Sequence, residues 1–541
     1  MIRAWKALPS RVAAVSTPMW VTLTALAFGG AIRVLHVLAR PSLWTDEAAL
    51  ATNIVQRGFS ELLDPLASNQ GAPVLFLWVQ RAVVLVAGNN EYALRLVPLL
   101  AGIATIGLAF LIGRRLVSPW VGAVAAVLVA LSPSLVRYSW EVKQYSSDAA
   151  LTLVLVLLAL HAAERPHDAR TLARLAGGGV LAMWASHPAA LTAAALGLIL
   201  AAGRVHRRDR TGVLGLMAVG ATWTISATIA WFVSFDELGG NQFLRDYWDD
   251  GFAPQPLSPG SFVAWLARAL VDIAEDPGGL AFGVIAIAAA VGGLVAVARR
   301  RPLHGAQLVA PGVAAVIAAS LGGFPLMGRM ALFLVPLLLL ALAALVELDR
   351  SGRWTVAASL LIVVLAGGGA RDVVVGVVDP PRRAESRAVF EHVAAHMEPG
   401  DQVWIHDVTV ETYRYYAPIV GVSADARTRW LDEETCATAA PSSLHTAAEG
   451  GRVWVVFAYT LSTRPDDEAE LLRRHLDAQA QRVASFDRHD AFATLYDFGS
   501  APSAEAAPPA VDGLACLGVS PEDPTPPTGL ATGPFGTGSS S

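Results

Sequence analysis

Charge is scarce in this sequence, and lysine is nearly absent. Only 16% of the 541 residues are Asp, Glu, Lys or Arg, whereas 54% are hydrophobic and the mean hydropathy is +0.48. Soluble proteins carry more charge, so the composition excludes an ordinary soluble protein. Lys6 and Lys143 are the only lysines, and the net charge is −5. Without a broad basic face, nucleic acid is not an expected partner.

Cysteine is also scarce, and the common nucleotide-binding and hydrolase motifs are absent from the sequence. The two cysteines, Cys436 and Cys516, cannot form a zinc site alone, but they could pair if their region faces an oxidising compartment. There is no Walker loop, no dinucleotide fingerprint and no G-x-S-x-G motif. The chemistry of the protein must therefore be sought in other residues.

Long apolar runs predict a polytopic α-helical membrane protein. Arginines cluster between the runs, and such loops face the cytoplasm. With these loops inside, we expect about eleven spans, an N-terminus inside and a C-terminal region outside. The predicted spans are residues 18–38, 92–112, 119–136, 147–162, 172–185, 188–202, 211–233, 279–298, 305–323, 330–347 and 354–370.

A further apolar run, Pro73 to Gly88, does not fit this alternation. Counting it as a span would move Arg114 and Arg115 outside, and its centre contains Gln80 and Arg81. A central arginine costs about 2.5–3.5 kcal/mol on membrane insertion. We therefore predict a helix that lies at the outer leaflet without crossing the bilayer.

The composition divides the chain into three regions. Residues 1–370 form the predicted transmembrane domain. Residues 371–500 contain alternating runs such as "DQVWIHDV" and amphipathic runs such as "SRAVFEHVAAHM", which predict a small extracytoplasmic α/β domain. Residues 501–541 are rich in Pro, Ala, Gly and Ser, which predicts a disordered tail.

The stretch "RPSLWTDEAAL" places two carboxylates, Asp46 and Glu47, just outside the first span. Such a pair can simply begin a helix, because "TDEA" is typical of a helix start. Adjacent helical side chains diverge by about 100°, so two functional carboxylates would have different roles. One would act as a base, and the other would hold a metal, an arginine or a backbone donor.

A second acidic stretch, "RYSWEVKQYSSD", lies at another predicted outer loop. As a helix, it would place four side chains within an arc of roughly 80°. A solvated helix end would show the same pattern, but a carboxylate at the mouth of a span is costly unless it faces protein or water. The four residues are Tyr138, Glu141, Tyr145 and Asp148.

Three further polar residues lie near the predicted outer surface. His187, in "WASHPAA", is either a hydrogen-bonding structural residue or a ligand. Arg95 and Arg329 lie near the outer ends of spans, where an arginine can reach a lipid headgroup or bind a phosphate.

Together these motifs resemble the GT-C superfamily of membrane glycosyltransferases. The resemblance rests on "WTDE" after the first span, "EYALR" before the second, "SPSLVRYSWEVKQY" and "GRMALFLVP". The branch that contains the protein O-mannosyltransferases and the lipid A aminoarabinose transferase is the most similar. The resemblance covers roughly residues 18 to 370.

The resemblance implies inverting transfer of a sugar from a polyprenyl-phosphate donor at the outer face of the cytoplasmic membrane. It implies that Asp46 acts as the base, with Glu47 as its neighbour. It places Asp148 or Glu141 at a second acidic position, and Arg95 and Arg329 at the donor phosphate. Other candidates for the cavity are Trp44, Tyr138, Tyr145 and His187.

The sugar, the acceptor and any metal stay open. The acceptor could be a glycan, a lipid or a protein, and the resemblance leaves dependence on a divalent metal undecided. A transporter of a lipid-linked saccharide would need polar residues through the bilayer midplane, whereas these spans are polar mainly at their outer ends. A non-catalytic scaffold that binds a wall polymer is the other alternative.

Overall fold

The computed structural model divides the chain into two compact units. It describes residues 16–235, 241–348, 352–380, 383–406, 409–422, 428–431, 448, 451–458, 473 and 476–500. The first unit consists of Met1–Leu43 and Ala49–Arg382, and the second of Trp44–Ala48 and Arg383–Ser541. The short segment Trp44–Ala48 therefore belongs to the unit that contains the C-terminal domain.

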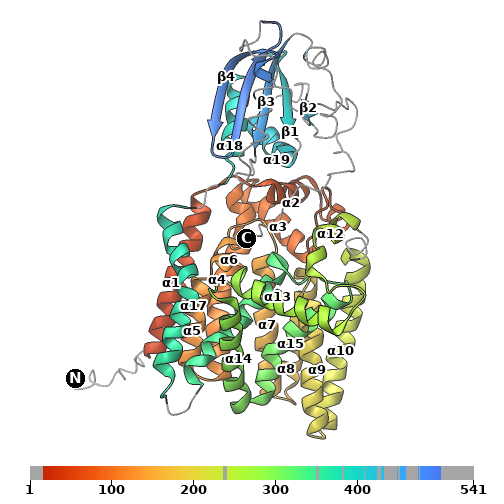
Figure 1. The fold of residues 1–541 in the computed structure, drawn as a ribbon. Coiled ribbons are helices and arrows are strands. Elements are labelled where there is room, and N and C mark those ends of the chain that lie inside the picture. The colour runs from red at the N-terminus through yellow and green to blue at the C-terminus, as the bar shows by residue number, and fades with distance from the viewer. Residues whose placement is uncertain are drawn as a thin grey trace, which may run out of the picture. The chain divides into compact units, whose positions relative to one another are not determined.

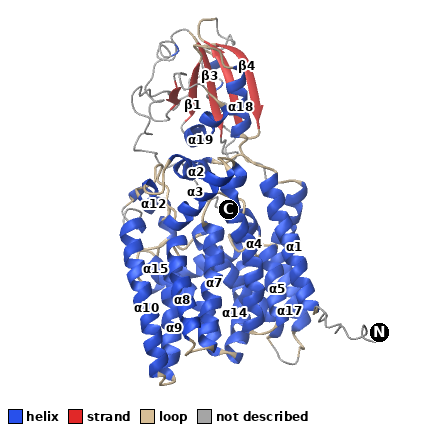
Figure 2. Cartoon of the chain, turned by 180° about the vertical axis from the view of Figure 1, so that it is seen from behind, coloured by secondary structure: helices blue, strands red, loops and turns tan. Residues whose placement is uncertain are grey.

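The first unit is a bundle of helices that run side by side (Figures 1 and 2). Within the described residues, nine helical segments are long and apolar enough to cross a membrane. The protein is therefore a multi-pass α-helical membrane protein, as predicted. The nine segments are α1 (Thr17–Leu38), α4 (Glu91–Leu116), α7 (Tyr145–Glu164), α9 (Ala189–His206), α10 (Arg210–Ala230) with η2 (Trp231–Phe235), α14 (Gly283–Arg300), α15 (Pro302–Ser320), η4 (Gly328–Leu334) with α16 (Val335–Ala343) and η5 (Ala344–Glu347), and α17 (Thr355–Val378).

Two of the eleven predicted spans form shorter helices. Residues 172–185 lie in α8 (Ala169–Ala185), and residues 119–136 are divided between α5 (Pro119–Ala130) and α6 (Pro133–Arg137). The division occurs at Pro133, because a proline disfavours helical backbone in the preceding residue and lacks an N–H donor. Ser132 is indeed extended, with φ −74° and ψ 121°.

The run around Gln80 forms α3 (Val74–Ala87), a helix of 14 residues. At 1.5 Å per residue it rises about 21 Å, less than the roughly 30 Å of a hydrocarbon core. Its central polar side chains bond to protein carbonyls, since the Gln80 amide donates to Leu94 at 2.8 Å and Arg81 donates to Val55 at 2.7 Å. The prediction that this segment does not cross stays untested, because α5 is shorter still and lies in a predicted span.

Shorter helices complete the first unit. They are the greater part of α2 (Thr45–Gln56), η1 (Glu61–Leu63), α12 (Gln242–Tyr247), η3 (Asp249–Gly251) and α13 (Pro259–Glu275).

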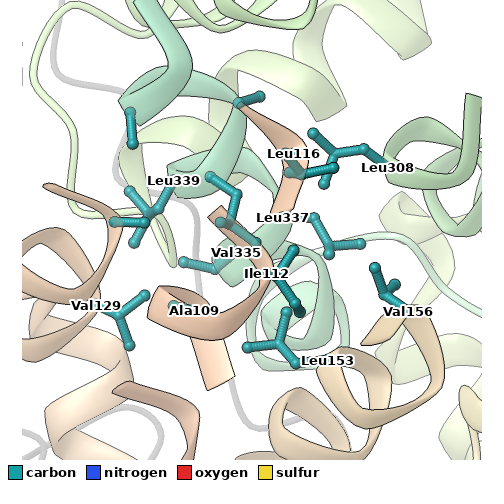
Figure 3. Close-up of a cluster of buried hydrophobic side chains, with 14 of the residues drawn as sticks. Ala109, Ile112, Leu116, Val129, Leu153, Val156, Leu308, Val335, Leu337 and Leu339 are labelled. Carbon is teal, nitrogen blue, oxygen red and sulfur yellow. The ribbon is translucent and has the colours of Figure 1, made fainter. Parts of the chain in front are cut away.

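The core of the bundle is formed by aliphatic side chains from α4, α5, α7, α15 and α16. Figure 3 shows these side chains converging between the helices. Glycines allow α4 and α5 to approach closely, because a Cβ atom on Gly113 would lie 2.7 Å from the Cα of Gly122. The labelled core residues are Ala109, Ile112, Leu116, Val129, Leu153, Val156, Leu308, Val335, Leu337 and Leu339.

A buried arginine inside α1 stabilises the end of α5. The Arg33 guanidinium donates to the carbonyls of Val129 and Ala130, both at 3.1 Å. These carbonyls have lost their helical partners because α5 ends before Pro133, and a cation at a helix C-terminus is favourable. Arg33 thereby fixes the point from which the chain turns into α6 and the second acidic stretch.

The second unit contains a five-stranded sheet in the order β2-β1-β3-β5-β4. The strand β1 pairs in parallel with β2 and β3, whereas β5 is antiparallel to β3 and β4. This confirms the predicted small α/β region. The elements are α18 (Ser386–His396), β1 (Gln402–His406), α19 (Val410–Val420), β2 (Thr428–Leu431), β3 (Arg452–Ala458), β4 (Gln481–Arg488) and β5 (Ala491–Asp497).

Aromatic side chains fill the core of this domain. Trp404 and Trp454 are almost fully buried, and the Trp454 indole N–H donates to Asp401 Oδ2 at 3.2 Å. Cys436, Cys516 and the predicted tail 501–541 lie outside the described residues.

Candidate active site

The first acidic pair begins α2. Glu47 is fully buried, and its Oε2 accepts from the Trp44 main-chain N–H at 3.4 Å and from Arg383 Nη1 at 3.1 Å. Asp46 is only partly buried. Because neighbouring helical side chains diverge by about 100°, Asp46 leaves α2 in a different direction from the anchored Glu47. This arrangement favours different roles for the two carboxylates, and the predicted role of Asp46 as the base stays untested.

Arg383 is a site residue that the sequence analysis missed. Its only sequence signal is the basic pair after the two prolines in "DPPRRAES". Its partner Glu47 lies 336 residues earlier in the chain, so no local pattern links them.

Arg95 holds the loop that precedes the acidic pair. It is fully buried, and its guanidinium donates to the Pro41 carbonyl at 2.7 Å and the Ser42 carbonyl at 3.5 Å. One turn earlier on α4, Glu91 pairs with Arg40 at 3.0 Å. These contacts favour a structural role for Arg95. Its predicted role in phosphate binding stays untested.

The second acidic stretch is not one continuous helix, so the predicted arc of four residues is wrong. The helix α6 ends at Arg137, residues 138–144 form turns, and α7 begins at Tyr145. Side-chain hydrogen bonds hold the turns. Lys143 donates to the Gln70 side chain at 2.6 Å, and Gln144 donates to the Gly71 carbonyl at 3.2 Å. These tertiary contacts outweigh local helix propensity.

The turns nevertheless bring several predicted residues together. The Tyr138 and Tyr145 rings meet edge to face, with centroids 5.3 Å apart. The Arg329 guanidinium carbon lies 5.8 Å from the Tyr145 ring centroid and 5.2 Å from the Trp248 ring centroid. We call Tyr138, Glu141, Tyr145, Trp248 and Arg329 the Arg329 cluster.

Electrostatics within this cluster keep Tyr138 protonated. Burial raises the pKa of the Tyr138 phenol to about 12, with a further contribution from the Glu141 charge and opposing ones from Arg137 and Arg329. Glu141 is itself buried and accepts from Arg137 Nε at 2.8 Å. The cluster therefore presents a guanidinium and a phenol O–H, which are both hydrogen-bond donors to an anion.

Asp148 and His187, the two remaining candidates, both lie beside Ser186. Asp148 is buried in the first turn of α7, and its carboxylate is beside the Ser186 hydroxyl. His187, the next residue, is partly buried between α8 and α9. Burial lowers the pKa of His187 to about 4, so its imidazole is neutral at pH 7 and cannot act as a cation for a phosphate.

His187 should make the protein sensitive to acid. Its pKa is about 4 when folded and about 6.5 when unfolded, so the unfolded chain binds more protons between these values. Stability should fall as the pH decreases from 6.5, by about 2 kcal/mol at pH 5, and the loss should end below pH 4. We expect His187→Asn to reduce the drop in thermal-unfolding midpoint between pH 7.5 and pH 5.

The matched control is His206→Asn, which makes the same change at an exposed position of α9. His206→Asn should keep the wild-type pH dependence. Equal pH dependence in wild type and His187→Asn would contradict the assignment of a neutral imidazole with a lowered pKa.

The described part of the chain provides no evident set of ligands for a metal ion. Over the described residues, no three His, Cys, Asp or Glu side chains come together closely enough to hold a metal ion. Of the two carboxylates in the second acidic stretch, Glu141 is paired with Arg137. Dependence on a divalent metal stays untested.

Comparison with known proteins gives a family match and a shared fold. Residues 71–231 match the family described as dolichyl-phosphate-mannose-protein mannosyltransferase. A search of curated proteins gave no match.

Two solved structures illustrate the structural likeness. ArnT from Cupriavidus metallidurans, in a crystal structure bound to undecaprenyl phosphate, is 15% identical, with 89% of this chain and 98% of that chain covered and a TM-score of 0.50. The archaeal oligosaccharyltransferase AglB from Archaeoglobus fulgidus, in complex with an inhibitory peptide and a dolichol-phosphate, is 11% identical. That alignment covers 87% of this chain and 74% of that chain, with a TM-score of 0.49.

The family match and the fold shared with ArnT confirm the predicted resemblance to the GT-C superfamily. The class of protein that they support is a multi-pass membrane glycosyltransferase. The matched range contains Arg95, Glu141 and Asp148 but neither Asp46 nor Arg329. The roles of those two residues therefore depend on the geometry of this chain.

Proposed function

We propose that this protein transfers a sugar, with inversion, from a polyprenyl-phosphate donor to an acceptor hydroxyl at the outer face of the cytoplasmic membrane. The observation that carries the proposal is the Arg329 cluster. Arg329 lies in the first turn of a membrane-spanning segment, between the Tyr145 and Trp248 rings. A lipid phosphate would lie at this level of the bilayer, and one guanidinium group can bind two phosphate oxygens at once. The undecaprenyl phosphate bound to ArnT supports a donor of this class.

The residues suit a single displacement. The Asp46 carboxylate takes the proton of the acceptor hydroxyl as its oxygen attacks the anomeric carbon. The bond from that carbon to the phosphate oxygen breaks, and the polyprenyl phosphate leaves with the electron pair. Its developing charge is stabilised by Arg329, with the Tyr138 hydroxyl as a second donor. Attack opposite to the leaving group inverts the anomeric centre.

Ion pairs at the other end of the bundle support the proposed orientation. Arg115 at the end of α4 and Arg301 before α15 both pair with Glu164 at the end of α7, at 3.7 and 3.5 Å. The candidate residues Arg95 and Tyr145 lie at the opposite ends of α4 and α7. Because basic loops favour the cytoplasm, these ion pairs support an outer position for the Arg329 cluster. The C-terminal domain, which follows α17, would then be extracytoplasmic.

The proposal is tested with purified protein in nanodiscs and synthetic polyprenyl phosphates carrying mannose, glucose, arabinofuranose or an amino sugar. Mass spectrometry of the co-purified lipid selects the first donor to try. We expect release of polyprenyl phosphate that depends on added glycan, lipid or protein acceptor. Movement of the donor between leaflets without cleavage would identify a flippase instead, and binding of a wall polymer without either activity would identify a scaffold.

A further inference from the structure

Arg383 connects two residues that flank the candidate base in sequence. Its Nη1 donates to Glu47 Oε2 at 3.1 Å, and its guanidinium carbon lies 5.5 Å from the centroid of the Trp44 ring. The Arg383 side chain is only 12% exposed, and that of Glu47 is fully buried. All three residues belong to the second unit. We call this arrangement the Arg383 clamp.

The clamp gives the buried Glu47 carboxylate the partners that it needs to offset its loss of hydration. A buried carboxylate needs a cation and hydrogen-bond donors, and Glu47 obtains them from Arg383 and from the Trp44 N–H. The contact between Glu47 and the Trp44 N–H is half of a capping box, with Trp44 at the N-cap and Glu47 three residues later. The arginine side chain adds contact with the face of the indole.

The clamp holds one face of the first turn of α2. Trp44 and Glu47 are three residues apart and so share this face, whereas Asp46 projects about 100° away from Glu47. We propose that Arg383 is a positioning residue, which fixes the rotation of this turn so that Asp46 presents its carboxylate to the acceptor. Glu47 then serves as the partner of Arg383 and takes no part in proton transfer. The catalytic consequence rests on the function proposed above, but the contact itself does not.

The contact is tested first through stability, which needs no substrate. Thermal unfolding is measured for wild type, Glu47→Gln, Arg383→Gln and the double variant in one detergent. We expect each single variant to lower the midpoint, Arg383→Gln the more because it leaves a buried carboxylate without its cation. The double variant should recover part of that loss. Strictly additive losses would overturn the clamp.

The positioning role is tested through kinetics. We expect Arg383→Gln to lower kcat about 10- to 100-fold, since misplacing a reacting group by about 1 Å has effects of this size. The donor KM should change less than about threefold, because the clamp does not touch the donor. Arg383→Lys should recover part of kcat. The matched control is Arg387→Gln, whose side chain pairs with Glu391 on α18 at 3.7 Å and should leave kcat unchanged.

The two experiments separate the possible failures. Coupled stabilities with a wild-type kcat in Arg383→Gln would overturn the positioning role. A rise in donor KM with unchanged kcat would also overturn it, because that result indicates donor binding. The effects of the two single variants on stability could prove coupled while the wild-type protein cleaves no polyprenyl-phosphate sugar. That outcome would support the clamp but refute the proposed function.

Discussion

Replacing Asp46 by Asn should reduce sugar transfer by about 10²- to 10⁴-fold while the protein folds normally. The amide keeps the size of the side chain and one acceptor oxygen, but it cannot take the proton of the acceptor hydroxyl at neutral pH. Asp46 is only partly buried, whereas its neighbour Glu47 is fully buried. The change should therefore affect chemistry and spare stability. Turnover is measured at saturating donor and acceptor, together with the thermal-unfolding midpoint.

The matched control is Asp64→Asn, an identical change at an exposed position in the loop after η1. It should keep the wild-type rate. If Asp46→Asn retained activity within a factor of about three, Asp46 would not be the base. The role would then pass to Glu141 or Asp148, although Glu141 is paired with Arg137 and Asp148 adjoins Ser186.

Hydropathy predicted most of the helical bundle because a span needs about 20 apolar residues, and this requirement acts locally. The same measure failed at residues 119–136, since apolar side chains continue across Pro133 although the helix cannot. The small C-terminal sheet was predicted from its alternating strands, which again is a local pattern.

The candidate site was less accessible to sequence analysis because its contacts are long-range. Tyr138, Tyr145 and Arg329 were each named as candidates, but helical periodicity placed Tyr138 and Tyr145 on one continuous helix. The turns between α6 and α7 depend on partners at Gln70 and Gly71, far away in sequence. Arg383 was missed for the same reason.

Substituting Arg329 by Lys should weaken use of the donor, although the charge is conserved. A guanidinium can bind two phosphate oxygens at once and lie against the Tyr145 and Trp248 rings, whereas an ammonium group is a compact point charge. A hydrogen bond between charged groups contributes about 1.5–3 kcal/mol, so the donor KM should rise by roughly 10- to 100-fold.

Two variants show whether this effect is specific to Arg329. Arg268→Lys, at an exposed position of α13, should leave the donor KM unchanged. Arg95→Lys should lower the unfolding midpoint and change the donor KM little, because Arg95 donates to the main chain at Pro41 and Ser42. Initial rates over a range of donor concentrations in one nanodisc preparation provide the comparison.

If Arg329→Lys and Arg268→Lys gave the same donor KM, the phosphate would have to bind elsewhere. Arg137 would be the next candidate because its side chain is 55% exposed, whereas Lys143 is buried and donates to Gln70.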